Sequence, residues 1–500
     1  VLALSVTAAR GLFREEGDPE RLVSLPADRR EVVRLLRREI EARLTCLDDV
    51  GLGYLTLERA GRTLSGGEVQ RVHLTAAIGT NLTGALFVLD EPSVGLHPQD
   101  TARLVTQLRR LVRQGNTVVV VEHDAAVLAA ADHVVDLGPG AGEHGGRIVA
   151  QGTTKDLVRV PESITGRWLA GERSMPAPRP RPEVGATVGV KGADANNLQG
   201  VDLIVRLGEL TALAGVSGSG KSTLAHDVLY LALARALGRP EGTPGVHAAV
   251  VGAEALGDVV LVDQAASGAS SRANPATYVG AWDAIRTLLA ATPAAKSRKL
   301  APGAFSFNVP GGRCEACQGD GLERIEMLFL SDIELVCSEC EGTRFRPVVR
   351  EVLWQGHSVS DLLALSVEDA LALFENAQEA PARRAGAALE PVARVGLGYL
   401  RLGQRASTLS SGEWQRLRLA AALGEKRVHK PRLYVFDEPT TGLHMEDVAR
   451  LLTALRHLAE RGHGVLVVEH HPELLASADR LVELGPGAGA EGGRVVADGT

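Results

Sequence analysis

The stretch GVSGSGKST, Gly215 to Thr223, decides the fold class of this 500-residue chain. Its first eight residues fit the phosphate-loop pattern G-x-x-x-x-G-K-[ST] without exception. The apolar run LTALAGV leads into it and suits a buried strand, and STLAHDVLYLALARAL follows and suits a helix. In this strand–loop–helix context the motif predicts a nucleotide-binding α/β domain rather than a chance glycine-rich turn.

The loop supplies the groups expected to bind the phosphates of ATP. Its glycines let backbone amides curl around the phosphates, Lys221 reaches the β and γ phosphates, and the Ser222 hydroxyl binds Mg²⁺. The expected ATP- and Mg²⁺-binding residues are Gly215, Val216, Ser217, Gly218, Ser219, Gly220, Lys221, Ser222, Thr223 and, from a second motif, Asp437.

That second motif is LYVFDEP, residues 433 to 439. Asp437 is placed to hold Mg²⁺ from a strand end, and Glu438 to polarise the attacking water. Gln264, after VVLVD, and His470, after VLVVE, are predicted to sense the metal-bound water and the γ-phosphate. Either alone would more often be an ordinary strand-end polar residue, and their order relative to the loop favours the catalytic interpretation.

Most of the chain is an internal repeat. VGLGYLTLERAGRTLSGGEVQRVHLTAAIG (50 to 79) matches VGLGYLRLGQRASTLSSGEWQRLRLAAALG (395 to 424), and LFVLDEPSVGLHPQD (86 to 100) matches LYVFDEPTTGLHMED (433 to 447). The phosphate loop occurs only in the second copy. We therefore expect the first loop upstream of Val1, in a truncated product or fragment. A genuine start at a non-Met codon is the alternative.

The repeat sets the expected domain boundaries. Alternate prolines in ERSMPAPRPRPE (172 to 183) indicate a semi-rigid extended linker. Residues 1–171 are then the C-terminal part of a first ATPase half, and residues 184–500 are a complete second half. In both halves, short β-branched apolar runs alternate with amphipathic helices, which predicts a parallel sheet covered on both faces.

LSGGE, residues 64 to 68, presents a Ser-Gly-Gly turn and a helix N-terminus to an anion. It resembles the signature of ABC-type ATPases, which sandwich ATP between the loop of one half and the signature of the other. The resemblance pairs the second-half loop with Ser65, Gly66, Gly67 and Glu68.

The other composite site lacks its loop. Its remaining parts are Asp90, Glu91 and His123 of the first half and Ser410, Ser411, Gly412 and Glu413 of the second signature. That signature reads LSSGE, and the Cβ of Ser411 is expected to crowd a backbone that must approach a phosphate.

Four cysteines form two C-x-x-C pairs: Cys314 with Cys317 and, after nineteen residues, Cys337 with Cys340. This spacing predicts one tetrahedral Zn²⁺ site in a module at about residues 305–350, inserted ahead of the second signature. Two disulfides or two unrelated pairs are the alternative. The fifth cysteine, Cys46, stands alone on a helical pattern and is expected to be a buried thiol.

Basic residues surround the cysteine module. Arg313, Arg324, Arg344 and Arg346 are candidate contacts to DNA phosphates, and a solvated charged surface is the alternative. Because the net charge is −7, any nucleic-acid contact must come from local patches. The aromatic content of 3% leaves few side chains for stacking unpaired bases.

The composition excludes some other classes of protein. Hydrophobic residues make up 45% of the chain, yet no segment approaches 18 uninterrupted apolar residues, so a membrane-spanning subunit is not expected. Paired cysteines in so cysteine-poor a chain suggest metal in a reducing cytoplasm.

A zinc module between an ABC phosphate loop and its signature resembles the UvrA family, the damage-recognition subunits of the bacterial excinuclease. The residues that carry the resemblance include GVSGSGKSTLAHDVL, NPATYVG (274 to 280) and FSFNVPGGRCEACQGDG (305 to 321). The resemblance implies a zinc-containing ATPase that dimerises, recognises distorted duplex DNA in nucleotide excision repair and hands it to the helicase partner UvrB. The UvrB-contacting module of the family would lie upstream of Val1.

Three other functions stay open. VDQAASGASSRANPATYVG departs from the more polar run of the family after Gln264, and a UvrA-like branch serves antibiotic self-resistance. A soluble transporter or translation-factor ATPase is a second alternative, against which the four-cysteine module argues. A non-catalytic truncated product is the third.

Overall fold

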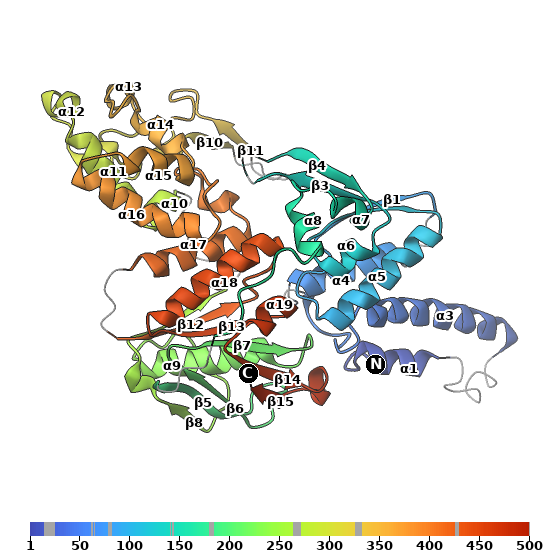
Figure 1. Ribbon diagram of the computed structural model, residues 1–500. Coiled ribbons are helices and arrows are strands. Elements are labelled where there is room, and N and C mark those ends of the chain that lie inside the picture. Colours follow the sequence, from blue (N-terminus) through green and yellow to red (C-terminus); the bar gives the residue numbers. More distant parts are fainter. Residues whose placement is uncertain are drawn as a thin grey trace.

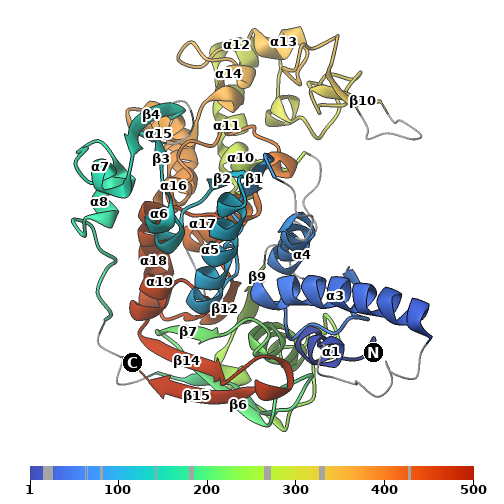
Figure 2. The same ribbon diagram turned by 90° about the vertical axis from the view of Figure 1, so that its right-hand side faces the viewer.

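The computed structural model describes residues 1–14, 26–61, 64, 66–78, 83–140, 142, 145–179, 185–263, 272–325, 333–425 and 430–499. Figure 1 shows the first half (blue to teal) beside the second half, whose sheet carries the green and red strands. The yellow and orange helices form an arm above that sheet, with α12 and α13 at its far end in both views (Figure 2).

The second half is built on a six-stranded sheet in the order β15-β14-β7-β13-β12-β9. Its strands are β7 (Leu210–Gly215), β9 (Asp258–Val262), β12 (Arg432–Asp437), β13 (Gly464–Val468), β14 (Arg480–Gly485) and β15 (Arg494–Gly499). All are parallel to their neighbours except β15, which pairs antiparallel with β14. Every residue of β7 and β13 is buried, as expected of parallel strands covered on both faces. The phosphate loop starts from a central strand of this sheet.

Helices cover the sheet and build the arm. The π-helical segment η4 (Thr223–Tyr230) follows the loop and continues as α9 (Leu231–Ala236), and α18 (Met445–Glu460) and α19 (Pro472–Ala476) follow β12 and β13. A second sheet, β6-β5-β8, is antiparallel, with β5 (Thr187–Ala193), β6 (Val201–Arg206) and β8 (Ala249–Val251). The arm contains α10 (Pro275–Tyr278), α11 (Ala281–Ala290), α12 (Pro293–Ser297), α13 (Pro347–Arg350), α14 (Val359–Ala364), α15 (Val367–Glu375), α16 (Ala380–Arg394) and α17 (Ser411–Gly424).

An antiparallel hairpin, β10 (Leu322–Ile325) with β11 (Ile333–Val336), extends from the arm between the two cysteine pairs. Arg405 contacts the hairpin, because its guanidinium donates to Glu334 Oε2 at 2.9 Å.

The described first half repeats only part of this architecture. Its helices are α1 (Val6–Phe13), α3 (Ala27–Asp49), α4 (Gly66–Ile78), α5 (Pro98–Arg113), α6 (Ala125–Ala130), α7 (Thr154–Leu157) and α8 (Ile164–Leu169). Its strands are β1 (Leu86–Asp90) parallel to β2 (Thr117–Val121), and β3 (Val134–Gly138) antiparallel to β4 (Arg147–Gly152).

The two pairs of strands in the first half are separate. The counterparts of β2 and β3, which are β13 and β14, both pair with β7, and no described strand of the first half takes that place. Apolar side chains are exposed in both pairs, Val88 by 66% and Leu137 by 67%. None of the described helices is long and apolar enough to cross a membrane.

The expected linker is described as far as Arg179, without helix or strand. It lies against the second half: the Arg456 guanidinium donates to the Pro176 carbonyl at 3.2 Å, and Arg179 donates to Asp479 Oδ2 at 2.8 Å. The linker therefore makes specific contacts with the second half.

Candidate functional site

The phosphate loop closes around its own lysine. Lys221 is 6% exposed, and its Nζ donates to the carbonyls of Gly215 and Val216, both at 2.9 Å. Burial lowers the pKa of Lys221 to about 8, against the opposing charges of Glu438 and Asp437. The loop thus holds a desolvated cation beside two carboxylates.

Asp437 is the last residue of strand β12, and Glu438 follows it; both act electrostatically on this lysine. His226 Nε2 lies 3.3 Å from Asp437 Oδ2, and His470 Nε2 lies 3.6 Å from Glu438 Oε1. Burial, with the neighbouring Glu438, raises the pKa of Asp437 to about 7. Burial also acts to raise the pKa of Glu438, but the hydrogen bond from His470 and nearby positive charges outweigh it and lower that pKa.

The two carboxylates are suited to different tasks. The buried Oδ1 of Asp437 has no hydrogen-bond partner among the described residues, as expected for an oxygen reserved for a cation. Glu438 has a positive φ of 46°, an unusual backbone conformation for glutamate and one that clusters at functional sites. Asp437 and Ser222 could hold Mg²⁺, which would supply positive charge to neutralise a bound phosphate.

Sequence reasoning missed Glu469, the residue before His470. One of its oxygens accepts from the Thr440 amide at 2.9 Å, and the other accepts from the His470 amide at 2.7 Å. Glu122 repeats the arrangement in the first half, accepting from the Ser93 and His123 amides at 2.8 and 2.9 Å. The sequence V-V-E-H occurs in both halves, and this repeat could have pointed to the two glutamates.

A cavity of about 1180 Å³ unites the loop with residues of the first half. From the second half it is lined by Ser217, Gly218, Gly220, Lys221, Ser222, Thr223, Ser411, Asp437, Glu438 and His470. From the first half it is lined by Tyr54, Leu64, Glu68, Arg71, Asp90, Glu91 and Gly95. The signature helix α4 of one half and the phosphate loop of the other therefore face one space. Ser65 and Gln264 lie outside the described residues.

Direct contacts cross between the halves at this cavity. The Ser217 hydroxyl donates to the Gly95 carbonyl at 3.2 Å. Gly95 has a φ of +67°, and a Cβ there would lie 3.2 Å from Glu438 Oε2. The relation is reciprocal, since Gly442 has a φ of +68° and a Cβ there would lie 2.9 Å from Glu91 Oε2. Each glutamate is thus packed by a glycine of the opposite half.

Two tyrosines that the sequence analysis did not single out contact the signature glutamates. The Tyr54 hydroxyl donates to Glu68, and its ring lies 3.0 Å from the position of a Cβ on Gly218. The Tyr399 hydroxyl donates to Glu413 Oε1 at 2.6 Å. The repeated G-L-G-Y-L sequence could have pointed to these tyrosines, but a tyrosine in an apolar run is usually interpreted as a core residue.

The parts of the second composite site are also assembled. His123 Nε2 lies 3.5 Å from Glu91 Oε1, and this hydrogen bond raises the pKa of His123. Ser410 caps α17 by accepting from the Glu413 amide at 3.2 Å. Ser411 lines the same large cavity as Asp90 and Glu91. Among the described residues, no phosphate loop other than Gly215–Thr223 approaches them.

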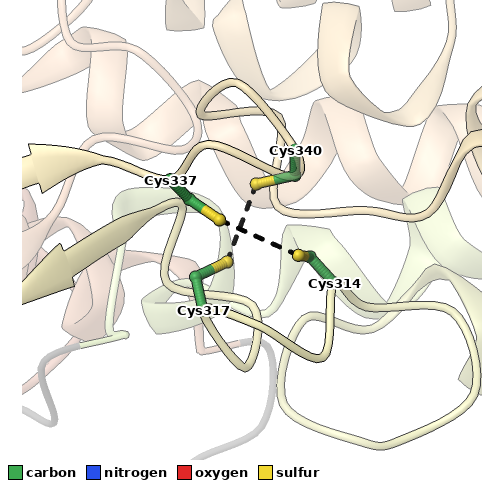
Figure 3. A group of neighbouring side chains, drawn as sticks. All are labelled: Cys314, Cys317, Cys337 and Cys340. Atoms are coloured by element: carbon green, nitrogen blue, oxygen red, sulfur yellow. Dashed lines mark hydrogen bonds between the residues drawn. The ribbon is translucent and has the colours of Figure 1, made fainter.

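The four paired cysteines converge in the arm (Figure 3). Their sulfurs all lie within 4.8 Å of one another, with Cys314 and Cys337 4.0 Å apart and Cys317 and Cys340 3.7 Å apart. Tetrahedral zinc with Zn–S bonds of about 2.3 Å separates its sulfurs by about 3.8 Å. These two sulfur pairs each join one C-x-x-C motif to the other. All four cysteines are free thiols, so the structure contains no disulfide between them.

The surroundings of the thiols also suit a cation. The Gly321 amide donates to Cys317 Sγ at 3.2 Å, a contact that stabilises a thiolate. The cluster could therefore hold a metal ion. Cys46 is buried in α3, as expected.

The four candidate DNA-contacting arginines differ in exposure. Arg344 donates to the Gly403 carbonyl at 2.9 Å and stacks 5.8 Å from the Phe307 ring centroid. The Arg313 side chain is 13% exposed and lies 3.5 Å from Glu315. Arg324 and Arg346 are exposed. Only the second pair is accessible to a macromolecular partner.

Comparisons with known proteins agree with this geometry. The ABC transporter family model matches residues 345–441. UvrABC system protein A of Thermus thermophilus is 50% identical over 95% of this chain and 50% of its own length, and that of Streptomyces avermitilis is 49% identical over 96% and 47%. The crystal structure of UvrA2 from Deinococcus radiodurans matches with a TM-score of 0.88 and 42% identity, over 100% of this chain and 60% of that one.

The chain spans about half the length of the curated relatives it matches. Over that half, the identity, the α/β fold with its phosphate loop and signatures, and the cysteine cluster all agree. The chain is therefore a homologue of the UvrA proteins, with the architecture of an ABC-type ATPase.

Proposed function

We propose that the chain binds and hydrolyses ATP between its two halves. The observation that carries this proposal is the single cavity shared by Lys221, Glu438 and the signature helix of the first half. In the proposed site Glu438 polarises water, Gln264 and His470 sense water and the γ-phosphate, and Asp437 with Ser222 holds Mg²⁺. Ser65, Gly66, Gly67 and Glu68 close the site from the opposite side.

The cysteine cluster, in this proposal, binds one structural Zn²⁺. The separations between sulfurs and the amide directed at Cys317 support it. The domain boundary is proposed at residues 172–183, and the module at about residues 305–350 belongs to the second half.

The activity proposed for the whole protein is ATP-dependent recognition of damaged or distorted duplex DNA in nucleotide excision repair. The homology to proteins named UvrABC system protein A supports it. A homodimer, a UvrB-type helicase partner and a cytoplasmic location are part of the same proposal. Binding would read the shape and deformability of the duplex, which suits a chain with only 3% aromatic residues.

The test compares an undamaged labelled duplex with the same duplex carrying one bulky adduct. Fluorescence anisotropy with ATP should give tighter binding to the adduct, and the adduct should change the steady-state ATPase rate. Lys221→Ala should abolish the ATPase rate and the effect of ATP on binding. ATP hydrolysis without any difference between the duplexes would contradict damage recognition, and no hydrolysis by the wild-type chain would contradict the proposal as a whole.

A further inference from the structure

Arg71 is a buried cation that lines the large cavity. It lies on α4, four residues after Gly67, and is 3% exposed. Its Nε and Nη1 have no hydrogen-bond partner among the described residues. Leaving charged donors buried and unpaired is costly, so a partner is expected from something that enters the cavity.

The counterpart of Arg71 in the repeat is satisfied differently. Arg416, on α17, is 5% exposed, and its Nε and Nη1 lie 3.4 and 3.5 Å from the carbonyls of Gly412 and Val395. The first half has an equivalent carbonyl at Val50, which Arg71 does not use. The two arginines occupy equivalent positions but only one retains unpaired donors.

The expected direction of the Arg71 side chain indicates a partner for its unpaired donors. Long side chains on a helix lean toward its N-terminus, and residues four apart share one face. Arg71 is therefore expected to lean past Gly67 toward the signature end, where an anion would dock. Its positive charge is close enough to contribute to the lowered pKa of Glu438, across the boundary between the halves.

The geometry points to Arg71 as a residue of the first half that donates hydrogen bonds to the γ-phosphate of ATP bound at the second-half loop. This inference rests on the proposed ATP site and extends it. A guanidinium suits the role because it is always charged and its planar donors can bind two phosphate oxygens together. The contact would be made only by nucleotides that carry a γ-phosphate.

The experiment separates this contact from a structural role by comparing ATP with ADP. In a Glu438→Gln background, which stops hydrolysis, dissociation constants for both nucleotides are measured with and without Arg71→Gln. Loss of charged hydrogen bonds predicts about 10- to 100-fold weaker binding of ATP, while ADP affinity should change less than about twofold. Arg71→Lys, which keeps the charge, should recover part of the loss.

The control is Arg416→Gln, which should leave the ratio of ATP to ADP affinity unchanged. Equal weakening of both nucleotides by Arg71→Gln, no weakening of ATP, or the same ratio change in Arg416→Gln would each overturn the inference. Failure of the wild-type chain to hydrolyse ATP would instead count against the proposed function. The two failures are therefore distinguishable.

Discussion

The Ser217 hydroxyl donates a hydrogen bond to the Gly95 carbonyl at 3.2 Å, joining the phosphate loop of the second half to the first half. A Cβ added to the same glycine would lie 3.2 Å from Glu438 Oε2. One residue of the first half therefore contacts both the loop and the carboxylate proposed to activate water. The reciprocal pair, Gly442 and Glu91, belongs to the site for which no loop is described.

Gly95→Ala should slow ATP turnover more than Gly442→Ala. Both glycines have positive φ, so alanine should cost a similar backbone strain of about 1 kcal/mol at either position. Only the Cβ at position 95 displaces Glu438, and we expect kcat to fall by about tenfold or more, because small misplacements of catalytic groups have large effects. Steady-state ATPase assays and thermal unfolding of both variants check this. Equal losses of kcat would mean that backbone strain, not the position of Glu438, sets the effect.

Purified wild-type protein should contain one zinc ion per chain, and Cys337→Ser should contain none. A structural Zn²⁺ needs all four thiolates as ligands, so loss of one should abolish binding. Metal analysis of protein prepared under reducing conditions measures it. Cys46→Ser, at a lone buried thiol far along the chain, is the control and should keep its zinc. Zinc retained in Cys337→Ser, or missing from the wild type, would rule out the four-thiolate site.

Arg346→Ala and Arg344→Ala should affect different properties, the first DNA binding and the second stability. Arg346 is exposed, so its loss should weaken duplex binding, reduce the salt slope by about one, and change stability by less than about 0.5 kcal/mol. Arg344 bonds to Gly403 and stacks on Phe307, so its loss should cost about 1–3 kcal/mol of unfolding free energy. Anisotropy titrations at several salt concentrations and urea unfolding distinguish the two. A lower salt slope for Arg344→Ala at unchanged stability would restore the original grouping of both as DNA contacts.

The sequence predicts those parts of the site whose chemistry resides in short motifs. The strand, loop and helix around Lys221 and the two cysteine knuckles have fixed local spacings, so their geometry could be expected in advance. Contacts between the halves could not, because they depend on how segments far apart in the sequence meet in space. Gly95 reads as a turn residue, Tyr54 as core and Arg71 as a helix-surface charge, and only tertiary placement gives each its neighbour. For the same reason Arg344 resembled a surface cation, although folding leaves it half-buried and stacks it on Phe307.

The pairing across the repeat is tested most directly by the same substitution at equivalent positions of the two signatures. In the proposed site, Gly66→Asp would place a carboxylate beside the phosphates held by the Lys221 loop. Ser411→Asp would place one at the equivalent position of the second signature, which lines the same cavity but is not paired with this loop in the proposal. We predict that Gly66→Asp lowers the steady-state ATPase rate by about 100-fold or more, and that Ser411→Asp stays within about twofold of the wild-type chain. Thermal unfolding of both variants confirms that each is folded. Normal hydrolysis by folded Gly66→Asp, together with loss of hydrolysis in Ser411→Asp, would contradict the pairing of the second-half loop with the first-half signature.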